Sequence, residues 1–402
     1  MSTHEHPAPV NFRLFTPGVK ALVAVMLTGA GFAVYRMIFG LAATTNMDDR
    51  YPMGLWIGMD EASGVALAGA GFTASALVYV FRREYFHAII RPALLTALLR
   101  YTFVAVSLLF DLGRWYNIWH PMMPSMWQGN SVLFEVGLCV MTYLTILYIE
   151  FSPIVLERFI GHVNLPGRLA RFNDPVDTAL RLIDFLLGKM MFLVILAGVT
   201  LSNLHQSSLG ALTVIVPYKL HPLYWSRLGP IFFLSSAIAV GFPLVIAELL
   251  IISWSLKRKA DMPMLTSLSG LTRYLLGAYV ALKLGDMLYR GTYVFLFEFS
   301  AASVVFWIEF GFLTVLPFLM FLSSDVRRSP SGLLVASLMY CTGVILNRCA
   351  VFFIAYEPLY VEKAYIPAFS EFVMTAGLAA AIAFLYRAAV TYFPILTPAR
   401  KT

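Results

Sequence analysis

Ionisable side chains interrupt the long apolar stretches of this chain. Lys283, Asp286 and Arg290 follow one another at positions i, i+3 and i+7, so they share one face of a helix. An ionised group in hydrocarbon costs at least ~2.5–3.5 kcal/mol, and such groups therefore pair with one another or line a proton or ion pathway. Two interpretations stay open for this face: a proton relay, or static ion pairing between helices.

Other polar groups gather toward one end of the apolar stretches. Carboxylates, a histidine and arginines at the same level are typical of an enclosed polar pocket, although any one of them is also found as an ordinary residue at a helix end. The group comprises Asp60, Glu61, Asp111, Arg114, Glu135, His205, Gln206, Asp286, Arg290, Glu309, Asn347, Arg348 and Glu371.

Part of this group has residue types suited to proton exchange. Asp111, Glu135 and Asp60 are candidates to supply or relay protons, because carboxyl groups exchange protons when their environment tunes them. Arg114 and Arg348 are expected to keep these carboxylates ionised or to orient them, since an unpaired buried carboxylate tends to neutralise.

His205 is a candidate hydrogen-bond partner or proton donor, because it is the histidine at a membrane edge beside the titratable group. An interfacial histidine with a structural hydrogen bond is the alternative. A second set of ionisable residues reaches from the polar end toward the opposite one and predicts an inward proton path. Its members are Lys283, Asp286, Arg290, Glu150 and Glu248, with Arg100 also in mid-helix.

Histidine and cysteine residues are not arranged in this sequence as a metal site requires. None of the seven histidines falls in the middle of an apolar stretch, whereas a b-type haem needs two axial ligands inside helices. Cys139, Cys341 and Cys349 include no C-x-x-C pair, and an iron–sulfur or zinc site needs about four ligands. We therefore predict no metal, haem or iron–sulfur cluster in this chain.

The composition indicates that a bilayer is the solvent for these residues. The chain has 402 residues, of which 59% are hydrophobic and 13% charged, whereas soluble domains carry about 25% charged residues. Its net charge of +7 does not indicate nucleic acid, because Lys and Arg sit in short clusters between apolar runs. We predict an all-α, polytopic membrane protein.

Ten apolar runs are long enough to span a membrane, since about 20 helical residues cross a hydrocarbon core of about 30 Å. They lie near 19–41, 57–81, 91–112, 131–151, 182–202, 230–253, 270–290, 300–323, 331–354 and 368–391. Pro243 and Pro317 fall inside runs and predict kinks. The transmembrane domain is expected over 19–391, with terminal segments 1–18 and 392–402.

Charges in the connecting loops predict the orientation. One set of loops is rich in Lys and Arg, and the positive-inside rule places that set and both chain termini in the cytoplasm. The set contains Arg82, Arg83, Arg91, Arg158, Arg168, Arg171, Arg181, Lys257, Arg258, Lys259, Arg327, Arg328, Arg400 and Lys401. The opposite loops hold Arg50, Arg114, Lys219, Arg227 and Lys363. Segment 152–181 is the longest inner loop, either a surface helix or a plain connector.

A faint repeat relates the two halves. Asp111-Leu-Gly-Arg114 closes the third run and Asp286-Met-Leu-Tyr-Arg290 closes the seventh, so the two motifs are four runs apart and share one orientation. The repeat predicts two four-helix bundles, over about 57–202 and 230–354, flanked by helices 19–41 and 368–391.

Several short motifs resemble the NrfD/PsrC-like membrane subunits, most closely the ten-span HybB-type branch found in hydrogenase-2, Qrc, Dsr and alternative complex III. The resemblance covers roughly residues 20–395. It is carried by Pro52-Met-Gly-Leu-Trp56 with Asp60, Asp111-Leu-Gly-Arg114-Trp-Tyr-Asn117, Asn130-Ser-Val-Leu-Phe-Glu135, His205-Gln-Ser-Ser-Leu-Gly210, Tyr218-Lys-Leu-His-Pro222, Phe306-Trp-Ile-Glu309 and Asn347-Arg348.

The resemblance implies a haem-free subunit of a respiratory oxidoreductase in the bacterial inner membrane. It implies menaquinone or ubiquinone near the periplasmic face, a periplasmic ferredoxin-like iron–sulfur subunit, and further catalytic or multihaem cytochrome subunits. We expect the quinone beside His205, Gln206, Asp111, Arg114, Trp115 and Arg348. Two alternatives stay open: a secondary transporter or proton channel without a redox role, and a passive membrane anchor.

Overall fold

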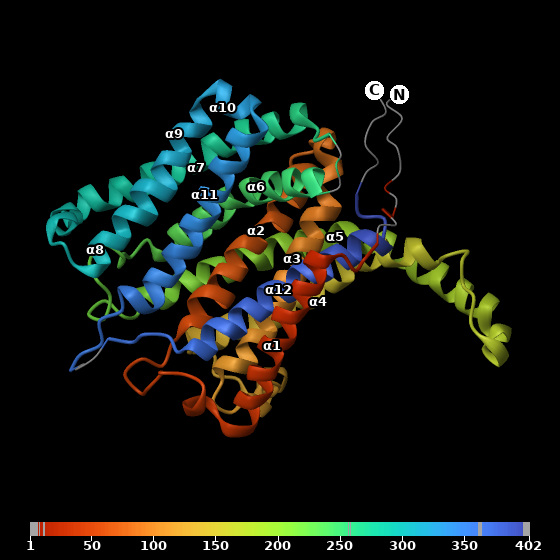
Figure 1. Ribbon diagram of the computed structural model, residues 1–402, viewed down its shortest axis with the longest axis horizontal. Coiled ribbons are helices and arrows are strands. Elements are labelled where there is room, and N and C mark those ends of the chain that lie inside the picture. The colour runs from red at the N-terminus through yellow and green to blue at the C-terminus, as the bar shows by residue number, and fades with distance from the viewer. Residues whose placement is uncertain are drawn as a thin grey trace.

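The computed structural model describes residues 7, 9–10, 13–255, 257, 259–360 and 364–396. Helices make up most of this part, and its only β-type contact is an isolated bridge between Leu220 and Tyr356 (Figure 1). About half of the terminal segments 1–18 and 392–402 falls outside the described residues. So do four of the charges used to predict the orientation: Arg258, Lys363, Arg400 and Lys401.

Each of the ten predicted spans corresponds to a long helical segment, so the all-α membrane architecture is confirmed. The segments are α1 (Pro17–Phe39), η2–α2–η3 (Ile57–Val80), η4–α3 (Glu84–Asp111), α4 (Val132–Phe159), α5 (Asn173–Val214), α6 (Gly229–Ser255), α7 (Met262–Arg290), α8–η10–α9 (Ala301–Leu322), α11–η11 (Pro330–Ile354) and α12 (Phe369–Tyr392).

Within the described residues, nine of these segments are apolar and long enough to cross a membrane. The exception is α7, because four ionisable residues interrupt its apolar sequence: Arg273, Lys283, Asp286 and Arg290. Burial inside the protein compensates for this polarity, since Lys283 and Asp286 are both buried.

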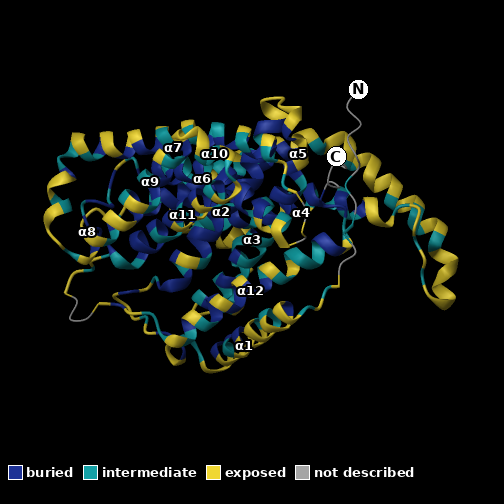
Figure 2. Ribbon diagram, turned by 45° about the horizontal axis from the view of Figure 1, so that its top comes forward, coloured by how far each residue is buried: buried dark blue, intermediate teal, exposed yellow. Residues whose placement is uncertain are grey.

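The helices pack as two rings. In bundle one, α2, α3, α4 and α5 contact one another in cyclic order; in bundle two, α6, α7, the η10–α9 segment and α11 do the same. The bundles meet where α2 and α5 pack on α6 and where α2 touches α11. Helices α1 and α12 pair beside bundle one and rest on α3 (Figure 1). The fully buried core follows the junction of the bundles (Figure 2).

Helices α1 and α12 approach at two glycines. A Cβ atom on Gly29 would lie 2.7 Å from the Cα atom of Gly377, so only glycine permits this crossing. The start of α1 and the end of α12 also lie together, since the Arg387 guanidinium donates to the Arg13 carbonyl at 3.0 Å. This pairing fixes the position of the last turn of α1, which carries a buried arginine, Arg36.

The segment 152–181 is mostly helical. Helix α4 continues to Phe159 and α5 begins at Asn173, so the connection between them is short. At 42 residues and about 1.5 Å per residue, α5 is roughly twice as long as a bilayer core is thick. The α4–α5 hairpin therefore extends beyond the other helices, as the yellow segment of Figure 1 and the exposed arm of Figure 2.

Prolines behave differently in the two predicted kinks. Helix α6 continues through Pro243, whereas Pro317 stands at the start of α9, where a π-helical stretch gives way to regular α-helix. The first helical turn tolerates proline because the missing N–H has no partner there.

Candidate functional site

Four carboxyl groups converge where α3 ends, a level that we call the Asp111 end of the helices. Asp60 and Glu61 come from η2 at the start of the second span, Asp111 from the last residue of α3, and Glu371 from the first turn of α12. We call these four residues the acidic cluster. Arg36 from α1 adds one guanidinium group beside it.

Hydrogen bonds hold two members of the acidic cluster in place. The Thr375 hydroxyl donates to Asp60 Oδ2 at 2.6 Å. Glu371 is fully buried and accepts hydrogen bonds from the Ala368 backbone N–H at 2.9 Å and from the Tyr365 hydroxyl. Burial and the bond to Glu371 raise the pKa of the Tyr365 hydroxyl, which lies in the loop before α12, so this phenol stays a proton donor.

Arg36 ties the end of α3 to α1. Its Nε donates to the Phe110 carbonyl at 2.8 Å and its Nη2 to the Leu112 carbonyl at 2.6 Å, while its charge acts on Asp111. Only 1% of Arg36 is exposed. A single buried guanidinium faces four carboxyl groups, so the cluster cannot be fully ionised without a large electrostatic cost.

Three buried polar atoms of this region have no hydrogen-bond partner among the described residues. They are Glu61 Oε1, Asp111 Oδ1 and the indole Nε1 of Trp56. Glu61 also lies close enough to Asp60 and Asp111 for their charges to act on it. A buried unpaired donor next to unpaired carboxyl oxygens is unusual in a static core and fits a site that receives a polar ligand atom.

Two π-helical stretches direct carboxylates inward. Asp60 and Glu61 lie in η2 (Ile57–Ala62), and Glu309 lies in η10 (Trp307–Val315). At each stretch a hydroxyl group donates to the carbonyl five residues earlier: Ser63, the first residue after η2, to Gly58 at 2.6 Å, and Thr314, within η10, to Glu309 at 2.8 Å. Such local insertions are frequent at functional sites because they rotate side chains off the regular helical register.

A second polar group lies inside bundle two. Asn347 Nδ2 donates to Glu309 Oε1 at 3.2 Å, and Arg348 Nη1 donates to Asn347 Oδ1 at 2.9 Å. Arg348 also donates to Ser236 Oγ at 2.8 Å and stacks 3.7 Å above the Phe233 ring. We call Lys283, Glu309, Asn347 and Arg348 the bundle-two cluster, and all four are buried.

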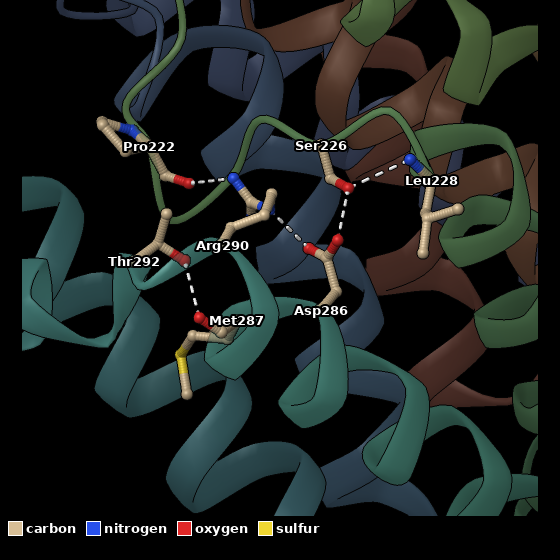
Figure 3. Close-up of polar contacts among 7 residues, drawn as sticks. All are labelled: Pro222, Ser226, Leu228, Asp286, Met287, Arg290 and Thr292. Atoms are coloured by element: carbon tan, nitrogen blue, oxygen red, sulfur yellow. Dashed lines mark hydrogen bonds and ion pairs between the residues drawn. The ribbon is translucent and has the colours of Figure 1, made fainter.

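Asp286 and Arg290 form a closed ion pair at the end of α7 (Figure 3). Arg290 Nε lies 2.8 Å from Asp286 Oδ2, and the Ser226 hydroxyl donates to Asp286 Oδ1 at 3.0 Å. Arg290 also donates to the Pro222 carbonyl at 3.2 Å. These contacts fasten the loop after α5 to α7.

His205 and Gln206 lie deeper than the sequence suggests. Helix α5 continues to Val214, well past the predicted end at 202, so both residues are fully buried in bundle one instead of at a membrane edge. The Tyr101 hydroxyl lies 2.9 Å from His205 Nδ1, and Gln206 Nε2 donates to the Val65 carbonyl at 2.6 Å. His205 Nε2 and Gln206 Oε1 have no partner among the described residues.

Three predicted site residues stand apart from the acidic cluster. Glu135 is exposed and accepts a hydrogen bond from the Ser208 hydroxyl. Arg114 is exposed, and its side chain makes no hydrogen bond or ion pair within the described part of the chain. Trp115 is partly exposed in a short 3-10 turn. Arg36 takes the place expected for Arg114 beside Asp111.

The remaining path residues form separate contacts toward the opposite end. Glu150 accepts a hydrogen bond from Ser75 at 3.2 Å, and Glu248 accepts one from Thr96 at 2.7 Å. Arg100 acts on Glu248 through its charge. In the described residues, no continuous chain of hydrogen bonds joins these groups to the acidic cluster.

Two cavities open at the end of the helices opposite to Asp111. One of about 410 Å³ is lined by Leu250, Trp254, Lys259 and Pro330, among others. The other, of about 390 Å³, is lined by Arg91, Pro153, Glu157 and Asp184, among others. Neither cavity lies beside the acidic cluster.

Comparison with known proteins identifies the relatives of this architecture. Residues 63–359 match the family described as polysulphide reductase, NrfD. The chain belongs to the NrfD family. The NrfD match spans most of both bundles, whereas Arg36, Asp60, Glu61 and Glu371 lie outside the matched range.

Three relatives match along almost their whole length. A Nitratidesulfovibrio vulgaris protein is 34% identical, with 97% of each chain covered. The probable Ni/Fe-hydrogenase 2 b-type cytochrome subunit of Escherichia coli is 28% identical, covering 98% of this chain and 96% of the relative. The menaquinone reductase integral membrane subunit of N. vulgaris is 24% identical, with 96% of each chain covered. The alignments with these relatives therefore extend beyond the matched family range into the flanking helices.

Proposed function

We propose that this chain is the quinone-handling membrane subunit of a multi-subunit respiratory oxidoreductase, and that the quinone head group binds at the acidic cluster. A bound quinone supplies two-electron, two-proton redox chemistry. The chain's own contribution is to bind and orient the head group, to hold protons near it and to keep bulk water away. The acidic cluster is the observation that carries this proposal.

The side chains of the acidic cluster, together with Trp56 beside it, fit a quinone head group. The unpaired indole N–H of Trp56 is a hydrogen-bond donor suited to a carbonyl oxygen. Glu61 and Asp111 offer carboxyl groups that hold or accept a proton, because four carboxyls share one neighbouring arginine. The aromatic ring of Trp56 packs with Phe110 and Met374, which gives the site an apolar wall.

The relatives support the same class of function. One is a menaquinone reductase subunit and another a hydrogenase subunit, and both align along nearly the whole chain. We therefore infer a quinone substrate, menaquinone or ubiquinone, and catalytic partner subunits. A periplasmic ferredoxin-like iron–sulfur subunit, with further catalytic or multihaem cytochrome subunits, is the arrangement that the NrfD/PsrC resemblance implies.

A haem in this chain is a separate matter, because the E. coli relative is described as a b-type cytochrome subunit. Of the histidines that the structure describes, only His205 lies in an α-helix, so the described residues do not fit a bis-histidine haem site. We predict that the purified chain lacks the visible absorption bands of a haem. Those bands in stoichiometric amount would contradict the prediction.

The roles of the deeper residues are proposals of the same kind. His205, with Tyr101 on one nitrogen and a free nitrogen opposite, is suited to a proton donor behind the head group. Gln206, Arg114, Trp115, Arg348 and Glu135 remain proposed neighbours of the quinone or its protons. Lys283, Asp286, Arg290, Glu150 and Glu248 remain the proposed route of protons toward the cytoplasm.

The test is quinone-linked turnover in assembled complexes that carry Asp111→Asn or His205→Ala. We expect both variants to assemble and Asp111→Asn to lose turnover, because an amide neither donates a carboxyl proton nor accepts one. Asp49→Asn is the matched control, since Asp49 is an exposed aspartate in the loop before η2, at the same end of the helices. Wild-type turnover in both test variants would exclude the proposed site.

A further inference from the structure

Lys283 is a charged group of bundle two without a hydrogen-bond or ion-pair partner among the described residues. Its side chain is only 6% exposed, yet no hydrogen bond or ion pair to it occurs among the described residues. Instead the amino nitrogen lies 4.8 Å from the centre of the Phe232 ring and 5.8 Å from that of Phe306. Cation–π contacts of this kind recover part of the cost of burying a charge, but only part.

The charges around Lys283 do not balance. Asp286 is already paired with Arg290. Glu309 is linked through Asn347 to Arg348, which leaves the Lys283 charge as an excess of one. A buried excess charge costs several kcal/mol. Loss of one proton makes the cluster neutral and removes this electrostatic cost.

Before it leaves the cluster, that proton can sit on Lys283 or on Glu309. Of the charged groups around Glu309, Lys283 acts on it most strongly, and Glu309 is likewise the charge that acts most strongly on Lys283. No Lys283–Glu309 contact falls within ion-pair distance in the described part of the chain. Such a gap between two coupled polar groups suits a bridging water.

The other groups facing this pair are donors. The hydroxyls of Tyr224, Tyr279 and Tyr340, from the loop before α6, from α7 and from α11, interact electrostatically with Glu309. The Tyr224 hydroxyl has no partner among the described residues, although only 4% of the residue is exposed. Tyr340 already donates to the Ser236 carbonyl at 3.3 Å. Glu309 therefore stands as the single carboxylate among these donors, of which Tyr224 and Lys283 are unpaired within the described residues, apart from Asp286 in its closed pair.

We propose that Lys283 and Glu309 form a proton-exchange pair inside bundle two, with Asn347 and Arg348 as positioning residues. When a proton arrives from solvent, one N–H or O–H bond forms in the pair, and the same bond breaks when the proton leaves. No electron moves in this step. Coupling of this exchange to turnover rests on the proposed quinone function, whereas the existence of the pair does not.

The first experiment tests the pair in the purified chain by infrared difference spectroscopy across a pH titration. We expect a carboxylic-acid carbonyl band that shifts in heavy water and is lost in Glu309→Gln. Glu298→Gln is the control, because Glu298 lies in the preceding loop and its side chain is 49% exposed. Lys283→Met should alter the pH dependence of the band, whereas Lys283→Arg should alter it less. An identical spectrum and titration in Glu309→Gln would overturn the proposal.

The second experiment measures protons moved per electron transferred by the assembled complex in sealed vesicles. We expect this ratio to fall in Glu309→Gln and to be unchanged in Glu298→Gln. An unchanged ratio in Glu309→Gln contradicts the coupled role of the pair. Failure of the quinone proposal has a different signature, namely normal quinone-linked turnover in Asp111→Asn, and leaves the infrared test of the pair unaffected.

Discussion

Arg36 shows how one side chain organises the Asp111 end of the protein. It donates two hydrogen bonds to backbone carbonyls at the end of α3 and places its charge beside Asp111. A buried arginine that neutralises part of an acidic cluster is costly to remove, because the carboxyl groups and carbonyls left behind lose their partner.

We predict that Arg36→Met lowers the free energy of unfolding by about 3–5 kcal/mol, the range found when one partner of a buried pair is removed. Chemical denaturation in detergent measures the change. The double variant with Asp111→Asn should lose less than the two single changes combined, because the unpaired carboxylate is gone. Lys20→Met, at an exposed position of the same helix, is the control. Strict additivity would show that Arg36 and Asp111 do not interact.

Tyr101 offers a second test at this scale. Tyr101→Phe removes only the hydroxyl that bonds His205 Nδ1, so it leaves a buried imidazole nitrogen unpaired. We expect a loss of about 1–3 kcal/mol in unfolding free energy. Tyr148→Phe should cost much less, because Tyr148 is half-exposed and its partner Thr102 keeps a hydrogen bond to the Leu98 carbonyl at 2.7 Å. Equal losses in the two variants would refute the special position of His205.

The polar residues of the site were only partly predictable. Asp60, Glu61, Asp111 and Glu371 stand out as carboxylates at one end of apolar runs, and the structure brings these four together. Arg36 was missed because a basic residue in the last turn of a membrane helix is usually interfacial. The grouping of the remaining residues depends on which helices pack against each other. These contacts cannot be predicted from the pattern of a single sequence.

At the scale of helices, the flanking pair α1–α12 is part of the acidic cluster. Arg36, Glu371 and Thr375 all come from these two helices, and the crossing of Gly29 with Gly377 sets their distance. The flanking helices therefore do more than shield bundle one from lipid. A change that separates them should disturb the cluster without altering any of its charges.

Gly29→Ala tests this dependence. Its new Cβ would meet the Gly377 backbone at 2.7 Å, so the helices must move apart. We predict a loss of about 1–3 kcal/mol in stability and a fall in quinone-linked turnover. Gly31→Ala, on the same helix but with nothing within 4 Å, should be neutral or stabilising by up to ~1 kcal/mol. A Gly29→Ala variant with normal stability and turnover would contradict the role of the crossing.

The number and approximate positions of the helices were easier to predict than their ends and their π-helical stretches. Hydropathy located all ten segments, because a bilayer core sets their minimum length. It missed the extension of α5 to Val214, since the residues after 202 are polar and small on one face and pack inside bundle one. It also missed the π-helical stretches at Asp60 and Glu309, because one extra residue per turn leaves no mark on a hydropathy profile.

At the scale of the whole molecule, ten traverses bring the start of α1 and the end of α12 to the same side. The arginine-rich loops lie at that side too, which predicts that it faces the cytoplasm. The loop 112–131 and the acidic cluster would then lie toward the periplasm, on the side where the proposed electron-transferring partner would dock.

Single-cysteine labelling checks this orientation. In a background without the three native cysteines, Ser125→Cys lies in the exposed loop after α3 and Arg168→Cys lies in the α4–α5 connection. We predict that a membrane-impermeant thiol reagent labels Ser125→Cys in intact spheroplasts and Arg168→Cys only after permeabilisation. The reverse pattern would invert the topology and place the acidic cluster at the cytoplasmic face.

The location of the quinone head group is the most direct test of the central claim. A photoreactive quinone should be cross-linked to the assembled complex, and the labelled peptides should be identified by mass spectrometry. The acidic cluster predicts label on the peptides that carry Trp56 and Asp111, and loss of that label in competition with excess native quinone. Competed label confined to the cavities at the opposite end, around Trp254 or Glu157, would contradict it.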